Sequence, residues 1–460
     1  MGSEGSKIRG DTVAGNLFNP EENIEIQTLF DKISGKSQLC QLNNLQRYLS
    51  SLLPEDIIQR IFVCCVKLSK TKQEGFTVNG LAAFLSSLFK GSLTDKSTIL
   101  VSLASTTREV SSPRMSEFVA LLIKSYVKIN QKSEQFKSWK FSSPEKWAKS
   151  LSLYLLTDLF EKGPSTQEAS GNPPERSFTE WELEAWLSSC PLFSHILDLV
   201  FHSCFRISQS EEYSERFLTP MIPTVSNVNW TKAQTILDVP ALILLSYSLP
   251  GELRGNWRPL YSNHQYGDSF SQLQTRILKQ GPTVIVVRDK AGHVFGGFAS
   301  VSWNIRPQFV GTASCFLFSL SPQFSVYNGT GYNEHYMYLN HGVKTMPNGL
   351  GMGGQLDYFG LWIDQSFSVG HSKAGPRCTT YGSPQLSKTA DFQVDVIEVW
   401  GVGPEPKEQA EDEECESSIL DKDPEAKAML SLIDRGPLSE GLREGDATAG
   451  SPEDHELPPL

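Results

Sequence analysis

The sequence predicts an α+β protein with an all-helical N-terminal part, a strand-rich part and an acidic tail. Between residues 20 and 207, apolar residues recur at three- and four-residue spacing, which is typical of amphipathic helices. Between residues 257 and 400, short runs rich in Phe, Trp, Val and Leu alternate with glycine-dense turns, which is typical of a packed β-sheet. A chain of 460 residues is too long for one hydrophobic core, so we expect two or three domains.

The domain order follows from these shifts in pattern. Residues 1–20 are small and polar, and we expect them to be disordered. A helical domain is expected over 21–207, and a connector rich in Ser, Pro and Asn over 208–235. A strand-rich domain over 236–403 and an acidic tail over 404–460 complete the chain.

The helical part contains two polar loops that end in a Phe–Thr step, EGFTVNG at 74–80 and RSFTEWE at 176–182. Each loop lies between helical segments, an arrangement that resembles the exit of an EF-hand loop. The sequence therefore predicts an EF-hand-like helical domain.

Calcium ligands are missing from the first of these loops. If Gly75 is the turn glycine, the first and third ligand positions fall on Lys70 and Lys72, and the closing position falls on Leu81. Calcium requires oxygen ligands there, and lysine repels the ion. The second loop, at 161–176, matches no ligand spacing. We predict degenerate, metal-free hands, with a calcium-responsive regulator as the alternative.

The strand-rich part begins after a short apolar helix at 237–247, and a second helix is expected at 269–279. The expected strands cover 283–288, 294–303, 314–320, 335–340, 357–364 and 394–400. A sheet flanked by a few helices follows from this pattern.

Several sequence blocks in this part occur in the order of one known family. They are WRPLYS (257–262), GDSFSQL (267–273), GPTVIVVRD (281–289), VFGGFAS (294–300), CFLFSLSP (315–322), TGYN (330–333), LGMGGQ (350–355), FGLWID (359–364), CTTYGSPQLS (378–387) and FQVDVIEVW (392–400). In this respect residues 257–400 resemble a TLDc domain. One departure is Tyr266, where the family usually has a histidine.

The resemblance implies an antiparallel β-sandwich flanked by helices. It also implies binding to the vacuolar proton-pumping ATPase, and an association with protection against oxidative stress. The MG start, the EF-hand-like region and the SILDKDPEA segment are similar to the mTOR-associated members of the family. This second resemblance implies mTOR pathway components as partners and the lysosomal membrane surface as the place of action.

Two histidines invite a metal-site interpretation. His335 and His341 lie six residues apart, so a continuous strand would place both on one side. Asp357 or Cys315 would have to supply further ligands, but spacing nominates no third ligand. Neighbouring tyrosines favour packed, structural histidines, and we predict no metal or other cofactor.

Two cysteines invite a nucleophile interpretation. Cys315 and Cys378 would need a base such as His371 or His293 beside them to lower the thiol pKa. Cys315 lies in the apolar run CFLFSL, where burial has the opposite effect. An oxidative-stress-protective protein with a reactive cysteine is therefore the alternative function and not the favoured one.

A glycine cluster at Gly349, Gly351, Gly353 and Gly354 resembles a phosphate-binding loop only superficially. It lacks the Lys and Ser/Thr that follow in a P-loop, and it lies between sheet segments. Glycines that permit a tight turn or a close backbone approach explain it better.

The N-terminus matches a lipidation pattern. MGSEGSK places Gly2 as the acceptor and Ser6 at the required position for N-myristoylation. One myristoyl chain binds membrane only marginally, with an association constant of about 10⁴ M⁻¹. A second contact is therefore required for stable residence at a membrane.

The acidic tail contains one short amphipathic helix, expected at about 424–435. Asp423 and Pro424 suit its start, and Gly436 and Pro437 stop it. Its apolar stripe consists of Ala426, Met429, Leu430 and Ile433. A helix this short is marginal alone in water, so the stripe requires a surface to bury it. A partner groove is favoured over the chain's own TLDc domain.

Charge and cysteine usage narrow the class of protein. Residues 404–460 hold 17 acids and 5 bases, which leaves 36 bases against 35 acids in the first 403 residues. With no basic stripe along the sequence, nucleic acid is not expected as a partner. The spacing of the eight cysteines does not match a disulfide framework. The sequence also shows no secretory signal and no apolar run long enough to span a membrane.

These observations combine into one functional hypothesis. The chain is predicted to be a non-enzymatic adaptor, cytoplasmic and peripheral on the lysosomal membrane. It would bind the vacuolar proton-pumping ATPase through its TLDc domain and support mTOR signalling.

Overall fold

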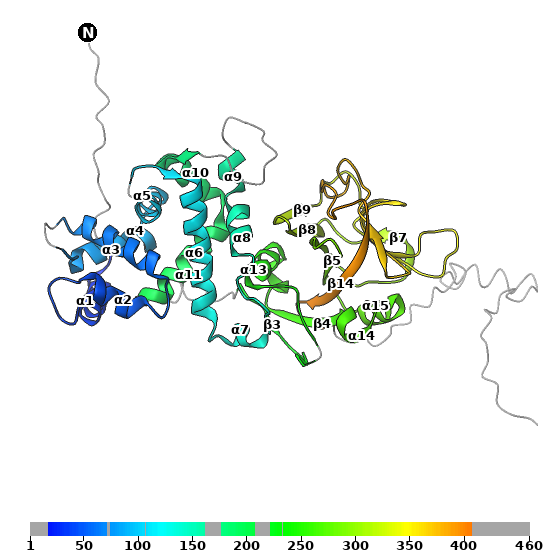
Figure 1. Cartoon of the computed structure of the whole chain (residues 1–460), viewed down its shortest axis with the longest axis horizontal. Coiled ribbons are helices and arrows are strands. Elements are labelled where there is room, and N and C mark those ends of the chain that lie inside the picture. The colour runs from blue at the N-terminus through cyan, green and yellow to red at the C-terminus, as the bar shows by residue number, and fades with distance from the viewer. Residues whose placement is uncertain are drawn as a thin grey trace, which may run out of the picture. The chain divides into compact units, whose positions relative to one another are not determined.

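The computed structural model describes residues 17–70, 74–105, 107–161, 176–207, 221–231 and 233–406 (Figure 1). These residues belong to one compact unit. The lipidation candidate at the N-terminus and the tail beyond residue 406 lie outside the described residues.

Helices build the N-terminal part, as the periodicity predicts. They are α1 (Pro20–Ser34), α2 (Leu42–Leu49), α3 (Glu55–Ser69), α4 (Val78–Phe89), α5 (Leu93–Ala104), α6 (Ser112–Asn130), α7 (Glu134–Ser138), α8 (Ala148–Leu155), α9 (Thr157–Glu161), α10 (Glu180–Ser189) and α11 (Pro191–Phe205). Polar residues set the starts of several helices. Asn19 caps α1 and Ser92 caps α5, each in a reciprocal capping box.

The helix–loop–helix units occur in two pairs. In the first pair, the loop between α1 and α2 meets the loop between α3 and α4 through an antiparallel bridge from Cys40 to Phe76. In the second pair, β1 (Val110–Ser111) and β2 (Ser177–Phe178) form the same kind of link. This paired arrangement is the EF-hand-like fold that the sequence predicts.

The Phe–Thr steps have a clear structural reason. Phe76 and Phe178 are fully buried and carry the loop-to-loop pairing. The next residue caps the following helix, because Thr77 accepts a hydrogen bond from the Gly80 amide and Thr179 accepts one from the Glu182 amide. Each step therefore joins a buried strand residue to a helix start.

The strands follow in the C-terminal part, together with three α-helices and a 3₁₀ turn. The helical elements are α13 (Val239–Ser248), η1 (Gly251–Leu253), α14 (Asn263–Tyr266) and α15 (Phe270–Ile277). The strands are β3 (Thr224–Val225), β4 (Asn256–Ser262), β5 (Thr283–Asp289), β6 (Val294–Ala299), β7 (Arg306–Val310), β8 (Phe316–Ser321), β9 (Ser325–Asn328), β10 (Met337–Asn340), β11 (Gly349–Gln355), β12 (Tyr358–Asp364), β13 (Val369–His371) and β14 (Asp391–Val402).

The strands form two layers that share one strand. The first sheet has the order β4–β14–β5–β6–β8–β9, with the short β3 added in parallel to β4. The second sheet has the order β7–β10–β11–β12–β13. The two are continuous because β13 pairs with the beginning of β14, while the end of β14 pairs with β4. Apart from the β3–β4 pair, the pairings in both sheets are antiparallel.

A sandwich core lies between the two sheets. Ile285 and Leu317 from the first sheet share a buried cluster with Leu339 and Met352 from the second. The antiparallel sandwich that the TLDc resemblance implies is therefore confirmed.

The other face of the first sheet is also buried. Along β5, Ile285 and Val287 belong to the sandwich core, whereas Val284 and Val286 belong to the cluster that fills the helical part. Strand geometry explains this alternation, because successive side chains point to opposite faces. The first sheet is thus covered on both faces.

Candidate functional site

The residues that the sequence marks for membrane and partner binding are not described. Gly2 lies outside the described residues, and so do Ala426, Met429, Leu430 and Ile433 of the expected tail helix.

The first EF-hand-like loop is only partly described. Lys70 is exposed and ends α3 in the left-handed conformation, while Lys72 lies outside the described residues. Most of the second loop, 162–175, lies outside them as well. Among the residues that are described, no group of three or more His, Cys, Asp or Glu side chains could hold a metal ion.

The two histidines of the metal-site interpretation contact different neighbours. His335 stacks on Phe309 with ring centroids 4.3 Å apart, and its Nδ1 lies 2.6 Å from the carbonyl oxygen of Gly354. His341 instead lies beside Phe270 of α15. His335 is therefore packed against an aromatic ring, whereas His341 is exposed.

The two candidate nucleophiles are buried in the sandwich core. The Cys315 thiol contacts the Ser300 hydroxyl at 3.1 Å, and Cys378 is 1% exposed. Within the described part of the chain, neither thiol is hydrogen-bonded to a histidine. Among the described residues, therefore, no histidine is placed to activate either sulfur as a base.

The glycine cluster forms part of a strand and not a turn between strands. Gly349 and Gly351 lie in β11 under the rings of Trp362 and Phe359, and a Cβ at Gly351 would be 2.6 Å from Phe359. Gly353 and Gly354 have positive φ angles of 71° and 85°. Both reasons for glycine, close approach and positive φ, therefore apply here.

An aromatic cluster joins the helical part to the first sheet. Trp139, which follows α7, lies 4.9 Å from Trp400 and 6.0 Å from Trp257 between ring centroids. Its indole N–H donates to the carbonyl of Pro223 at 2.8 Å, and Trp230 donates to the carbonyl of Ser138 at 2.8 Å. Trp139 and Trp230 thus satisfy their single indole donors, whereas Nε1 of Trp257 is buried without a hydrogen-bond partner.

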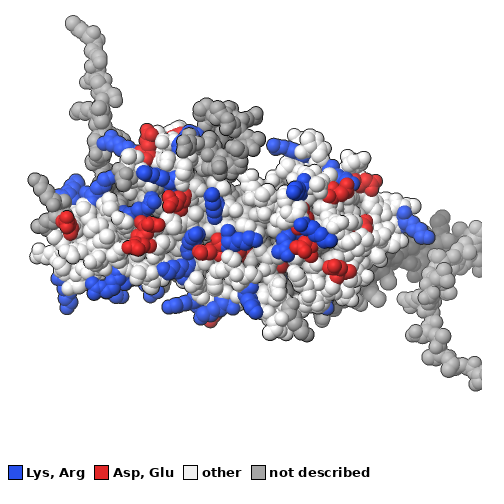
Figure 2. All heavy atoms as spheres, viewed as in Figure 1, with Lys and Arg blue, Asp and Glu red and all other residues white. Residues whose placement is uncertain are grey.

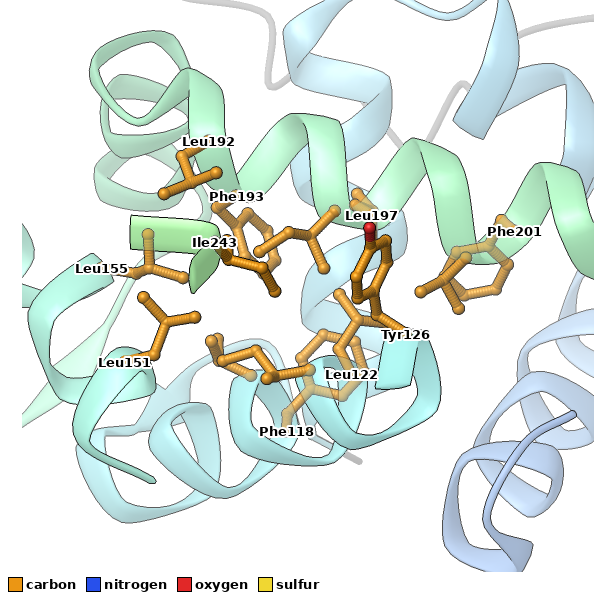
Figure 3. Close-up of a cluster of buried hydrophobic side chains, with 14 of the residues drawn as sticks. Phe118, Leu122, Tyr126, Leu151, Leu155, Leu192, Phe193, Leu197, Phe201 and Ile243 are labelled. Carbon is orange, nitrogen blue, oxygen red and sulfur yellow. The ribbon is translucent and has the colours of Figure 1, made fainter. Parts of the chain in front are cut away.

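Helix α13 extends this junction into the helical core. Figure 3 shows Ile243 of α13 beside Leu151 and Leu155 of α8, within a cluster that also holds side chains of α6 and α11. Residues 239–246 of α13 are all buried. The helix that leads into the strand-rich part is therefore a core element of the helical part.

Two buried carboxylates fasten the same junction. Asp238 accepts hydrogen bonds from the amides of Trp147 at 2.7 Å and Ala241 at 2.9 Å. Glu398 of β14 accepts from the Thr235 hydroxyl at 2.9 Å, the Ile236 amide at 2.7 Å and the indole of Trp400. Burial raises the pKa of both carboxyl groups to about 7.

The second sheet differs from the first because its neighbourhood exposes large apolar side chains. Within residues 233–406 the exposed large hydrophobic residues are Ile305, Tyr332, Tyr358 and Val369. All four belong to strands of the second sheet or to the loops beside them. Tyr332 is 86% exposed and Tyr358 is 58% exposed, and aromatic residues are enriched at protein–protein interfaces relative to the rest of the surface.

A hollow of about 610 Å³ lies at the joint between the second sheet and β14. Trp362 and Val369 line it together with three aspartates, Asp289, Asp364 and Asp391. Its His371 nitrogen Nε2 is buried without a hydrogen-bond partner, and burial lowers the pKa of His371 to about 4. Lys290 also lines the hollow and Lys373 pairs with Asp391 at 2.6 Å, so this side of the sandwich combines apolar groups, charges of both signs and a neutral imidazole.

Comparison with known proteins places these features in a family. The TLDc domain model matches residues 230–403. The chain is 39% identical to the MTOR-associated protein MEAK7 of Gallus gallus over 448 residues, which cover 93% of this chain and 95% of the relative. It is 38% identical to the protein of that name from Homo sapiens, over 93% of this chain and 96% of the relative.

The chain belongs to the MEAK7 family of TLDc-domain proteins. A second kind of relative is more distant: Nuclear receptor coactivator 7 of Homo sapiens is 32% identical over 158 residues, which cover 34% of this chain and 16% of that protein. The resemblance stated from the sequence blocks is therefore confirmed for the family. None of the described helices is both long and apolar enough to cross a membrane.

The junction residues and the exposed tyrosines were not predicted from the sequence as functional groups. Trp139, Trp147 and Trp230 precede or lie at the edge of the TLDc blocks, so no block drew attention to them. A usable signal was the density of tryptophan and tyrosine at the edges of the expected domains.

Proposed function

We propose that this protein is a non-enzymatic peripheral adaptor that binds the vacuolar proton-pumping ATPase through its TLDc domain. In this role it supports mTOR signalling at the lysosomal surface. The name of the MEAK7 relatives, which describes them as MTOR-associated, supports the signalling part. The resemblance of the sequence blocks to the TLDc family supports the pump as the partner.

The difference between the two sheets is the observation that carries the proposal. The outer face of the first sheet is filled by the chain's own helices, so it is not free for a partner. The second sheet and its loops carry the exposed apolar side chains. Partner binding therefore belongs on the second-sheet side, with Tyr332 and Tyr358 as candidate anchors.

Two regions outside the described residues complete the adaptor. Myristoylation of Gly2 supplies weak membrane affinity, and the stripe of Ala426, Met429, Leu430 and Ile433 fits a helix-in-groove contact with a partner. Linked weak contacts reinforce one another, because the first raises the effective concentration of the second. The adaptor can then stay at the membrane without any single high-affinity binding site.

Replacement of the exposed tyrosines tests the pump contact. Tyr332→Ala with Tyr358→Ala should reduce recovery of pump subunits about tenfold in affinity purification followed by mass spectrometry. The matched control is Val63→Ala, which changes an exposed apolar residue of α3 in the helical part. Equal recovery of pump subunits by wild type and the double variant would remove the second-sheet side from the proposal.

Two further variants separate the regions at the chain ends. Gly2→Ala should shift the protein from membrane fractions to the cytosol, because the acyl acceptor is lost. Deletion of residues 405–460 should weaken partner recovery and leave the unfolding transition of the remaining chain in place. If both variants behave as wild type in membrane fractionation and partner recovery, this division of labour is wrong.

A further inference from the structure

The helical part carries a lysine-rich face that is not apparent in the sequence. We define the basic face by six exposed residues, Lys32, Arg47, Lys124, Lys128, Lys132 and Lys137. They come from the end of α1, from α2, from the C-terminal half of α6 and its following turn, and from α7. Figure 2 shows Lys and Arg atoms gathered along the lower edge of the view, where Figure 1 places α2, the lower end of α6 and α7.

Contacts between the elements bring these residues together. The Lys128 ammonium donates to the carbonyl of Ser50 at 2.7 Å, which joins the end of α6 to the end of α2. Lys32 lies over the ring of Tyr48 at 5.7 Å, and the Tyr48 hydroxyl donates to the carbonyl of Cys204 at 3.3 Å. The ends of α1, α2, α6 and α11 therefore meet on one side of the helical part.

The positive charge of this face is not neutralised within the described residues. None of the six basic side chains forms an ion pair with another described residue. Arg206, at the end of α11, adds a further cation near Tyr48. Glu21, Glu22 and Glu25 of α1 and Glu117 of α6 lie in the N-terminal halves of their helices, so Asp31 and Glu134 are the acids nearest the face along these elements, and the cations there outnumber them.

The kind of cation indicates the kind of partner. Five of the six residues are lysines, whose ammonium groups act as hydrated point charges without the planar geometry that selects one phosphate or carboxylate. Such a face suits a diffuse anionic surface. Lysine-rich segments beside a membrane are attracted to its anionic leaflet in this way.

We propose that the basic face docks on an anionic lipid surface and supplies the second contact that a single acyl chain at Gly2 requires. This inference rests on the proposed peripheral membrane role. One acyl chain combined with a basic patch is a sufficient pair of signals for stable anchoring. The face is formed by α1, α2, α6 and α7 and the second sheet by β7 and β10–β13, so lipid docking and partner binding use different elements.

The test uses the full chain without acylation, so that the basic face is measured alone. Cosedimentation is compared between phosphatidylcholine vesicles and vesicles that contain about 30% phosphatidylserine. The wild type should bind the anionic vesicles, and binding should fall as salt screens the charges. Lys124→Ala, Lys132→Ala and Lys137→Ala together should lower the affinity on the order of 100-fold, since each basic residue contributes a factor of about five.

A matched control changes the same number of charges elsewhere. Lys290→Ala, Lys344→Ala and Lys388→Ala replace exposed lysines of the TLDc domain, and this variant should bind the vesicles as wild type does. Lys128 is left unchanged in both variants because its contact with Ser50 is structural.

Three results would overturn the inference. In the first, wild type binds neutral and anionic vesicles equally well. In the second, the Lys124, Lys132 and Lys137 triple variant binds anionic vesicles as wild type does. In the third, the Lys290, Lys344 and Lys388 control variant loses as much vesicle binding as that triple variant. Tighter binding of a duplex RNA or DNA probe, lost in the same triple variant, would assign the face to nucleic acid instead. Recovery of pump subunits by the triple variant tests the proposed function separately, because the second sheet is intact.

Discussion

The two sheets of the sandwich share one strand but have opposite surroundings. The first sheet has a core on each side, with Val286 turned to the helical part and Val287 turned to the second sheet. The second sheet shares the sandwich core and carries on its other face only a small buried cluster of its own, Tyr338, Phe359 and Trp362, while Tyr332 and Tyr358 stay exposed around it.

This difference separates the sheet that stabilises the fold from the sheet that we propose binds a partner. Burial on both faces makes the first sheet the structural link between the helical part and the TLDc domain. Exposure makes the second sheet the part where substitutions can change binding while the fold is kept. Substitutions in the two regions should therefore differ in size and in kind.

The largest effect is expected at the junction. Trp139→Ala removes a ring packed among Trp230, Trp257 and Trp400, and leaves the Pro223 carbonyl without its donor. Truncation of a buried tryptophan costs about 3–5 kcal/mol of unfolding free energy. Urea unfolding followed by circular dichroism measures this loss.

Trp181 provides the matched control for that variant. Its side chain is 74% exposed on α10, so Trp181→Ala should change the unfolding free energy by less than about 0.5 kcal/mol. Similar losses at Trp139 and Trp181 would contradict the view that the junction holds the two parts together.

The second largest effect concerns pH and the buried Glu398. Its pKa is raised by burial to about 7, so the folded protein keeps a proton that the unfolded chain releases near pH 4.5. The stability from this proton is complete below about pH 4.5 and is lost as the pH rises to about 7. The difference corresponds to about 3 kcal/mol, and Asp238 acts in the same direction.

Glu398→Gln should flatten this dependence on pH. Unfolding free energies of wild type and variant, measured between pH 5 and pH 8, should converge toward the higher pH. The variant also loses stability at low pH, because its amide N–H₂ faces the donors of Thr235, Ile236 and Trp400. Parallel pH profiles of the two proteins would show that Glu398 does not titrate in this range.

A smaller effect is expected inside the second sheet. Gly351→Ala would place a methyl group 2.6 Å from the ring of Phe359 and 2.9 Å from Trp362. Overpacking of this kind costs about 1–3 kcal/mol. Gly255→Ala is the control, since no atom lies within 4 Å of the added methyl group. Equal melting temperatures of the two variants would contradict the tight packing at β11.

The division into a helical part and a strand-rich part was predictable because local patterns determine it. The periodicity over residues 20–207 predicts helices such as the one around Leu122, and the apolar runs predict β5, β8 and β12. The strands β4, β7, β9, β11 and β13 were not predicted, and in β11 the reason is that its glycines read as a turn signal. These glycines are required instead because the rings of Phe359 and Trp362 pack closely against them. The two rings belong to the next strand, so a short sequence pattern does not reveal the contact.

The candidate sites were predictable to a lesser extent. The count of charges over the first 403 residues is nearly balanced, which conceals the basic face around Lys124 and Lys128. That face exists because α6 ends beside α2, a contact between residues 128 and 50. The buried Glu398 is similar, because its donors Thr235 and Ile236 lie more than 160 residues before it. Sequence position alone does not bring such groups together.

The smallest effect on stability is expected at the exposed edge of the second sheet. Tyr358→Ala shortens a side chain that is 58% exposed at the start of β12, so little buried area is lost. The unfolding free energy should change by less than about 0.5 kcal/mol, with the same dependence on urea concentration as wild type. A loss above about 1.5 kcal/mol would make Tyr358 part of the core and would remove the contrast between the sheets. A small loss combined with lower recovery of pump subunits would place the residue on the binding side, because the fold that presents it is then intact.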